Sequence, residues 1–344
     1  MSYSLETILP SDKRFNLKMD TLLEAEGIRR DGHLDYSCGL FDDDYNLVAT
    51  GSSYGNTLRC LAVSSEHRGE GLMNQVVSHL CERLMGKGYM HIFLYTKLKN
   101  MKIFSDLGFY EIARVEETLV FMENRRNGFS SFLNSLKKTE TESACIVMNA
   151  NPFTMGHRYL VEKAASENKY VHLFLLSEEA GPIPFSVRKK LVTEGIKDLE
   201  NVIFHESGPY MISSATFPSY FLPDGDSAIK AHAILDIAIF SKIAQYLNIK
   251  SRYVGSEKTS HVTGLYNSVM ETELPKYGIR FVEVKRLEQD GVTVSASTVR
   301  QAIHDNCLES VLPMLPESAA SFFTSPESEQ VKKNIRAMAD PRHY

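Results

Sequence analysis

The chain has 344 residues, of which 43% are hydrophobic and 24% are charged, and its formal net charge is -5. This length predicts about two domains, each large enough to bury its own core, and this composition is typical of a globular protein. The negative net charge argues against a nucleic-acid-binding protein, whose binding surface would be basic.

Neither a membrane span nor a secretory signal is expected. The longest apolar stretch, residues 231–247, carries His232, Asp236 and Lys242, and the segment Met1–Glu6 lacks the pattern of a signal peptide. The five cysteines are odd in number and scattered, without Cys-x-x-Cys spacing, so we expect reduced thiols in a cytoplasmic protein. No grouping of histidines and cysteines predicts a metal site.

Residues 1–125 are predicted to form a mixed α+β domain. Strands are expected at residues 46–50, 57–63 and 91–95. Residues 71–85 carry apolar side chains at helical spacing, which predicts a helix between the second and third of these strands.

The segment just before this predicted helix reads Glu-His-Arg-Gly-Glu-Gly-Leu-Met. Through Arg68, Gly69 and Gly71 it resembles the Arg-x-x-Gly-x-Gly/Ala loop of the GNAT acetyltransferase family, and residues 100–110 resemble that family's later helix and turn. The resemblance implies a GNAT-like domain whose loop N–H groups hold the pyrophosphate of coenzyme A or a similar arm. A plain turn between strand and helix is the alternative interpretation.

Two positions depart from the GNAT pattern. Met73 stands where the loop ends in a small residue, and Phe104 stands where many members carry the tyrosine that protonates the leaving thiolate. A phenyl ring has no proton to give, and Tyr95 and Tyr110 suit packing or surface positions better than this role. Ordinary acetyl transfer from acetyl-CoA is therefore not expected in this domain.

Residues 126–143 are predicted to link two domains. Phe129, Phe132, Leu133 and Leu136 keep helical spacing between two polar stretches, which predicts a short bridging helix.

Residues 144–305 alternate between strand and helix patterns. The predicted strands are residues 145–149, 171–176, 202–205, 252–254 and 280–284, and the predicted helices are residues 157–166, 185–196, 228–247 and 266–275. Such alternation predicts a Rossmann-like, doubly wound parallel sheet, in which ligands lie outside the carboxyl ends of the strands. Residues 306–344 are expected to form a less regular, helical C-terminal appendix.

The first of two motifs in this region reads Asn-Ala-Asn-Pro-Phe-Thr-Met-Gly-His, residues 149–157. Thr154 and His157 fall on the first turn of a predicted helix, where free N–H groups and the positive end of the helix dipole favour phosphate, and Gly156 allows close approach. The pattern Thr-x-Gly-His resembles a signature of the nucleotidyltransferase superfamily, whose members transfer nucleotidyl groups from ATP or CTP. A helix-capping threonine beside a buried histidine is the alternative.

The second motif reads Val-Ser-Ala-Ser-Thr-Val-Arg, residues 294–300. It resembles the Ile-Ser-Ser-Thr-x-Ile-Arg motif with which the same superfamily holds the triphosphate, and Ser297 replaces the threonine. Hydroxyls at a helix start, backed by the bidentate Arg300, suit the β- and γ-phosphates. A serine-rich cap with a solvated arginine is the alternative.

Further positions at the predicted strand ends are expected to complete a nucleotide site. The superfamily resemblance implies ATP contacts at the following residues: Asn149, Asn151, Phe153, Gly156, Arg188, Gly255, Ser256, Glu257, Ser295 and Thr298. A solvated helix arginine is an equally good interpretation of Arg188. The apolar loop at residues 216–222 suits a small acyl pocket, although it is as well explained by packing.

The order of these segments resembles the citrate lyase ligase family over most of the chain. That resemblance implies an acid–thiol ligase in which ATP, acetate and the thiol form of the citrate lyase acyl carrier subunit give AMP, diphosphate and the acetylated lyase. It implies Thr154, His157, Ser297 and Arg300 as the catalytic residues, and Mg²⁺ is expected with the triphosphate. The carrier's prosthetic group derives from dephospho-CoA, so the GNAT-like domain is expected to dock it near Arg68, Gly69 and Gly71.

Two other functions remain open from the motifs alone. One is a nucleotidyltransferase that adenylylates a phosphate substrate such as phosphopantetheine or nicotinamide mononucleotide. The other is a non-catalytic regulator that binds acyl-CoA and a nucleotide. Neither the oligomeric state nor the residues of an acetate pocket can be predicted from the sequence.

Overall fold

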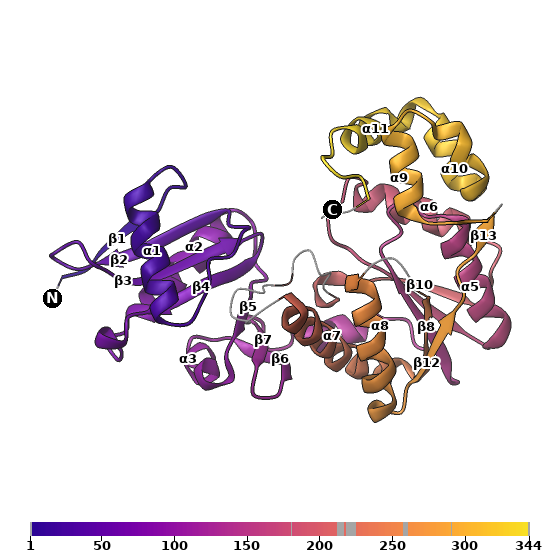
Figure 1. Cartoon of the computed structure of the whole chain (residues 1–344). Coiled ribbons are helices and arrows are strands. Elements are labelled where there is room, and N and C mark those ends of the chain that lie inside the picture. Colours follow the sequence, from indigo (N-terminus) through magenta and orange to yellow (C-terminus); the bar gives the residue numbers. More distant parts are fainter. Residues whose placement is uncertain are drawn as a thin grey trace. The chain divides into compact units, whose positions relative to one another are not determined.

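The computed structural model describes residues 2–179, 181–211, 217, 225–256, 261–289 and 291–342 (Figure 1). The chain divides into two compact units: unit 1 comprises Met1–Phe129 and Pro218–Ala231, and unit 2 comprises Ser130–Phe217 and His232–Tyr344. Within the described ranges, every helix is too short or too polar to span a lipid bilayer.

Unit 1 is built on a seven-stranded sheet with the strand order β1-β2-β3-β4-β5-β7-β6. The strands are β1 (Ser4–Thr7), β2 (Tyr36–Phe41), β3 (Leu47–Tyr54), β4 (Thr57–Val63), β5 (Phe93–Thr96), β6 (Tyr110–Val115) and β7 (Leu119–Glu123). Neighbours are antiparallel except β4 and β5, which run parallel and pair through Thr57 with Phe93 and Leu58 with Leu94. The expected α+β architecture of this domain is confirmed.

Helices cover both faces of this sheet. They are α1 (Lys13–Ala25), α2 (Leu72–Gly86) and α3 (Met101–Asp106), with short 3-10 helices η1 (Ser65–His67) and η2 (Leu98–Asn100). Leu40 of β2 packs in the core that contains α2, whereas the adjacent Phe41 packs in the core that contains α1. Because successive strand side chains point to opposite faces, α1 and α2 lie on opposite sides of the sheet.

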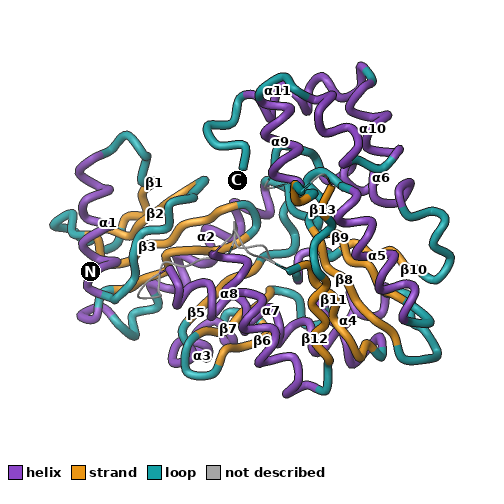
Figure 2. Tube along the Cα trace, turned by 45° about the vertical axis from the view of Figure 1, so that its right-hand side comes forward, coloured by secondary structure: helices purple, strands orange, loops and turns teal. Residues whose placement is uncertain are grey.

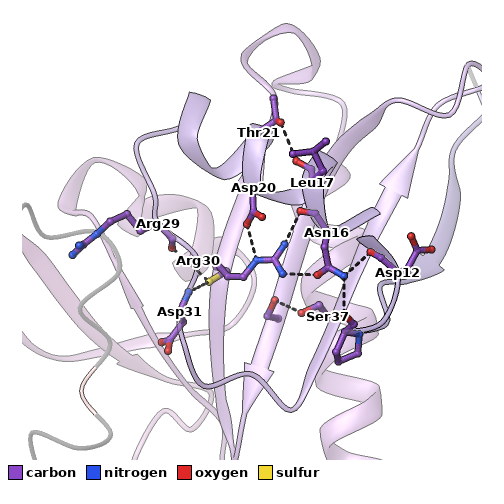
Figure 3. A network of polar contacts seen from close by, with 12 residues as sticks. Asp12, Asn16, Leu17, Asp20, Thr21, Arg29, Arg30, Asp31 and Ser37 are labelled. Carbon is purple, nitrogen blue, oxygen red and sulfur yellow. Dashed lines mark hydrogen bonds and ion pairs between the residues drawn. The ribbon is translucent and has the colours of Figure 1, made fainter. Parts of the chain in front are cut away.

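A polar network fixes α1 and the chain that follows it (Figure 3). Asp12 caps α1 by accepting hydrogen bonds from the N–H groups of Arg14 and Phe15. Arg30 donates to the Asn16 carbonyl at 2.6 Å and forms an ion pair with Asp20 at 2.7 Å. The loop after α1 is thereby tied back to the helix.

Unit 2 is built on a five-stranded, all-parallel sheet with the order β10-β9-β8-β11-β12. The strands are β8 (Ser143–Met148), β9 (Val171–Leu175), β10 (Val202–Glu206), β11 (Ile249–Gly255) and β12 (Arg280–Val284), and a separate hairpin joins β13 (Glu288–Gln289) to β14 (Val292–Thr293). The five predicted strands and the doubly wound sheet are confirmed. The strand order reverses between β8 and β11, which is where such sheets bind ligands.

Figures 1 and 2 show α5 and α6 on one side of this sheet and α7 and α8 on the other. The helices are α4 (Gly128–Ser135), α5 (Met155–Glu167), α6 (Phe185–Gly195), α7 (Gly225–Leu247), α8 (His261–Glu273), α9 (Ala296–His304), α10 (Glu317–Thr324) and α11 (Glu329–Arg336), with 3-10 helices η3 (Gly208–Tyr210), η4 (Leu274–Tyr277), η5 (Leu308–Met314) and η6 (Pro326–Ser328). A helix, α4, lies within the segment predicted to bridge the two domains, and the division between the two units falls inside it.

The segment after residue 305, expected as a less regular, helical appendix, is well packed. Val311, Phe323 and Ile335 belong to the same hydrophobic core as Ile146 of β8 and Val161 of α5. The helical pattern of this segment is visible in the sequence, but its burial against the sheet domain depends on contacts that the sequence does not reveal.

The opposite face of the sheet buries two neighbouring histidines. His172 on β9 and His205 on β10 are 0% and 6% exposed, and Nδ1 of His172 lies 2.9 Å from Nε2 of His205. Burial lowers the pKa of both rings well below 6.5, so both are neutral in the folded protein.

This pair predicts that the free energy of unfolding falls as the pH drops below about 6.5. In that range the unfolded chain binds protons at both histidines and the folded chain does not, so each contributes a loss of about 1.4 kcal/mol per pH unit. Urea unfolding at pH 7.5 and pH 5 measures this loss. The double substitution His172→Leu and His205→Phe is expected to reduce this loss of unfolding free energy, whereas replacing the exposed His33 by Gln is not. An unchanged loss in the double variant would contradict the prediction that these two histidines cause it.

Candidate functional site

The loop after β8 leads directly into the first turn of α5. Thr154 is the N-cap of this helix, with φ -123° and ψ 168°, and its Oγ1 accepts a hydrogen bond from the His157 N–H at 3.4 Å. The His157 ring returns toward the cap, since the Thr154 N–H donates to its Nδ1 at 3.1 Å. This reciprocal capping box makes the first turn of α5 rigid and leaves its remaining N–H groups directed outward.

The hydrogen bonds define the tautomer of His157. Nδ1 accepts from the Thr154 N–H and lies 2.8 Å from its hydroxyl, so the neutral ring carries its proton on Nε2. Burial, and then the positive charges of Arg286 and Arg300, lower the pKa of His157 from 6.5 to about 4. At neutral pH the ring is therefore an uncharged N–H donor at the start of a helix.

A second helix start presents three hydroxyl groups. Ser295 is the N-cap of α9 and accepts a hydrogen bond from the Thr298 N–H at 3.1 Å. Its Oγ lies 2.9 Å from the Ser297 hydroxyl and 2.8 Å from the Thr298 hydroxyl. All three residues are half-buried. The arrangement offers hydroxyls and backbone N–H groups to an anion in the same region.

The two motifs, about 140 positions apart in the sequence, touch in the structure. A Cβ built on Gly156 would lie 2.8 Å from the backbone carbonyl oxygen of Val294, the residue before the α9 cap. In addition, Nη1 of Arg300 on α9 donates to the carbonyl of Asn151 in the loop before α5 at 2.5 Å. The starts of α5 and α9 are therefore neighbours, as required if they hold one ligand.

The two predicted arginines are both buried and engaged with backbone carbonyls. Arg188, at the start of α6, is 1% exposed; it donates to the carbonyls of Asn149 at 2.8 Å, Leu176 at 2.9 Å and Glu178. It thus ties the carboxyl ends of β8 and β9 together. Arg300 is 4% exposed and bonds the carbonyls of Pro341, Asn151 and Arg342. Contact of these two arginines with phosphate stays a prediction. Their hydrogen bonds to backbone carbonyls are present in the structure.

Asn151 has an environment that the sequence does not disclose. It is 2% exposed, and neither its Oδ1 nor its Nδ2 has a hydrogen-bond partner within the described part of the chain. A buried amide without partners costs free energy, so Asn151 is a candidate to bind a polar atom of a ligand. Phe153, by contrast, is fully buried and packs in the core, its ring centroid 6.0 Å from that of His157.

The carboxyl ends of β11 and β12 form the other border of the site. Gly255 ends β11, and the next residue, Ser256, accepts a hydrogen bond from the Arg286 N–H at 3.3 Å. Glu257, predicted as a ribose contact, lies outside the described residues, as does the predicted acyl-pocket loop except for Phe217. Phe217 is 8% exposed and its ring lies 4.8 Å from that of His232.

Arg286 is a candidate that the motif comparison did not identify. It follows β12 by two residues and is half-buried, and its positive charge contributes to the lowered pKa of His157. Its Cγ lies 3.9 Å from a Cβ built on Gly255. Its position in the sequence could have identified it, because it follows a predicted strand of a doubly wound sheet, and ligands bind at that edge of such sheets.

Unit 1 contains the second candidate site, the loop before α2. Gly69 and Gly71 have φ angles of 88° and 75°, and a Cβ at either would meet no described atom within 4 Å. Arg68 is 63% exposed and pairs with Glu26. The glycines therefore leave the start of α2 open for a ligand's close approach to the backbone. Phe104 is buried and Tyr95 stacks on Phe121, so both are packing residues.

Comparison with known proteins agrees with this architecture. Residues 143–323 match the citrate lyase ligase C-terminal domain family, and residues 5–109 match the acetyltransferase (GNAT) family. The chain is 36% identical over 282 residues to citrate (pro-3S)-lyase ligase of Escherichia coli (strain K12), covering 79% of this chain and 80% of that one. It is 31% identical to the protein of the same name from Haemophilus influenzae, covering 92% and 97%.

Among solved structures, a GNAT-family acetyltransferase from Staphylococcus aureus MU50 is similar at a TM-score of 0.31 and 12% identity, covering 36% of this chain and 100% of that one. The similarity to the ligases, by contrast, extends over most of this chain and most of each ligase. The chain belongs to the citrate lyase ligase family.

Proposed function

We propose that this enzyme uses ATP to acetylate the thiol prosthetic group of the citrate lyase acyl carrier subunit. The observation that carries the proposal is the meeting of the α5 and α9 starts, through Gly156 against the Val294 carbonyl and Arg300 on the Asn151 carbonyl. Two helix starts that face one region offer N–H groups, hydroxyls and positive dipole ends to a triphosphate.

In this proposal ATP lies across the carboxyl ends of β8 and β11. The first turn of α5, with Thr154 and His157, faces the α-phosphate, and the hydroxyls of Ser295, Ser297 and Thr298 face the β- and γ-phosphates. Arg286 contributes positive charge near His157. These donors suit a polyanion, because they are N–H and O–H groups accompanied by positive charge.

The first step is attack of an acetate oxygen on the α-phosphorus. The bond from the α-phosphorus to the oxygen that bridges to the β-phosphate breaks, and acetyl adenylate and pyrophosphate form. Acetate is already ionised at pH 7, so this step needs no general base. The task of the protein is to orient two anions and to stabilise charge that builds on phosphate oxygens, which the neutral Nε2–H of His157 can do without proton transfer.

In the second step the carrier thiol, as thiolate, attacks the acetyl carbonyl carbon. A thioester forms, AMP leaves and the thiol proton passes to solvent. A free thiol is only a few per cent thiolate at neutral pH, so holding it close to the adenylate is the main requirement.

Mg²⁺ fits the site as a companion of the triphosphate. In the described ranges no group of three or more His, Cys, Asp or Glu side chains could hold a metal by itself. Mg²⁺ is commonly bound by substrate phosphates with few protein ligands, and there it would neutralise phosphate charge. We also place the enzyme in the cytoplasm, in agreement with the free thiols of Cys38, Cys60, Cys81, Cys145 and Cys307.

Exchange of labelled pyrophosphate into ATP tests the proposal. We expect exchange that depends on acetate and proceeds without the carrier subunit. Exchange that requires a phosphate substrate such as phosphopantetheine would favour an adenylyltransferase, and tight ATP binding without any exchange would favour a regulatory binding protein.

For unit 1 we propose docking of the carrier's dephospho-CoA-derived arm at Arg68, Gly69 and Gly71. The open start of α2 supports this, while Phe104 argues against acetyl transfer there.

Replacing Arg68 by Glu is therefore expected to raise the KM for the carrier subunit by about tenfold, the effect of losing one charge-assisted contact. Acetate-dependent exchange should be unchanged, because adenylate formation takes place in unit 2. Steady-state kinetics with and without the carrier measure both, and Lys102→Glu, an exposed charge reversal in the same unit, is the matched control. A fall in exchange in the Arg68 variant would show that the two units do not divide the reaction in this way.

A further inference from the structure

The side chain of Arg300 connects three segments of unit 2. It lies on α9, and its Nη1 donates to the Asn151 carbonyl at 2.5 Å. Its Nε donates to the Pro341 carbonyl at 2.7 Å, and its Nη2 donates to the Arg342 carbonyl at 2.9 Å. All three donor nitrogens of the guanidinium therefore have backbone partners.

Burial makes these bonds energetically significant. With Arg300 only 4% exposed, water has little access to replace a lost partner, and a buried cation with unpaired donors is costly. If the carbonyls of Pro341 and Arg342 were removed, the guanidinium would have to turn toward solvent or find other acceptors. Either change would alter its bond to Asn151, which lies in the loop that leads to Thr154 and His157.

The segment 340–342 is itself held in place against α9. The Arg342 N–H donates to Oδ1 of Asp340 at 2.9 Å, which forms a local turn, and Nε of Arg342 donates to Gln301 at 3.2 Å. Pro341 is buried. The segment is thus docked along the helix rather than merely following it.

We propose that Arg300 acts as a positioning residue, which links the segment 340–342 to the loop before α5, and that this segment is thereby a functional part of the nucleotide site. The inference rests on the proposed binding of ATP at the α5 and α9 starts. It assigns Arg300 a role different from direct phosphate contact, and it gives a function to a segment far from either motif in the sequence.

Three variants test the proposal: Arg300→Gln, a chain that ends after Met338, and the two changes combined. The measured quantity is the Kd of ATP with Mg²⁺ by calorimetry. Each single change is expected to raise this Kd by about tenfold to a hundredfold, as for a lost hydrogen bond to a charged group. The combined change should raise it no further than the larger single effect, because both break the same link.

Direct phosphate contact by Arg300 predicts a different result. The shortened chain would then bind ATP as tightly as the wild type, or the two effects would multiply; either result overturns the proposal. Asp340→Ala, an exposed substitution that breaks only the turn, should raise the Kd a few-fold. Because this variant keeps the full chain, it tests the link even if the shortened chain misfolds. Arg30→Gln in unit 1 removes another guanidinium that bonds a backbone carbonyl, that of Asn16, and should leave the Kd unchanged.

Hydrogen exchange separates this inference from the proposed function. In the protein without ligand, the amides of residues 150–157 should exchange faster in both single variants than in the wild type, and equal exchange rates would overturn the link. A wild-type protein that binds ATP but acetylates no carrier would refute the proposed function and leave the link intact.

Discussion

Replacing His157 by Asn is expected to lower the rate of acetate-dependent ATP–pyrophosphate exchange by about 10²–10³-fold, the usual effect of removing one donor to a developing oxyanion. The Asn side chain can place an oxygen where Nδ1 lies and so keep the bond from the Thr154 N–H, but it cannot replace the Nε2–H group. The cap is retained while the donor is lost. The loss should therefore fall mainly on kcat.

The control for this variant is His304→Asn on α9, which pairs with Asp305 on the surface and should exchange like the wild type. Thermal unfolding of both variants should stay close to that of the wild type. A full rate in the His157 variant, or a rate loss explained entirely by unfolding, would remove this histidine from the mechanism.

Replacing Gly156 by Ala should damage both helix starts at once. The new methyl carbon would lie 2.8 Å from the Val294 carbonyl oxygen, a backbone atom that cannot rotate away, so α5 and the α9 cap must move apart. Such overpacking typically costs about 1–3 kcal/mol of unfolding free energy. Because the displaced segments are the proposed phosphate-binding turns, the Kd of ATP should rise by more than tenfold, which corresponds to about 1.4 kcal/mol.

Gly264→Ala on α8 is the matched control. A Cβ there meets no described atom within 4 Å, and Ala is favoured over Gly in a helix by about 1 kcal/mol, so this variant should be as stable as the wild type or more so. Urea unfolding and ATP calorimetry distinguish the two glycines. If Gly156→Ala bound ATP normally, the contact between the two motifs would not matter for the nucleotide site.

Local features of the site could be predicted because they depend on residues close together in the chain. Thr154 and Ser295 act as N-caps, as residues of their type do at helix starts, and the alternation of apolar runs was enough to predict β8 to β12. Gly69 and Gly71 have positive φ angles, as a turn that needs glycine would require.

What the sequence by itself determined is therefore the succession of strands β8 to β12 and the helices between them, the caps of α5 and α9, and the two motifs that mark the family. Only the tertiary structure decided what the arginines do. Arg188 and Arg300 donate to carbonyls that lie 10 to 149 positions away in the chain, apart from one nearer contact of Arg188 with Ile183. Arg286 follows another strand, and its positive charge lowers the pKa of His157. The reason is that periodicity and capping encode short-range geometry, whereas the acceptors of a buried guanidinium are set by which strand ends and segments pack around it.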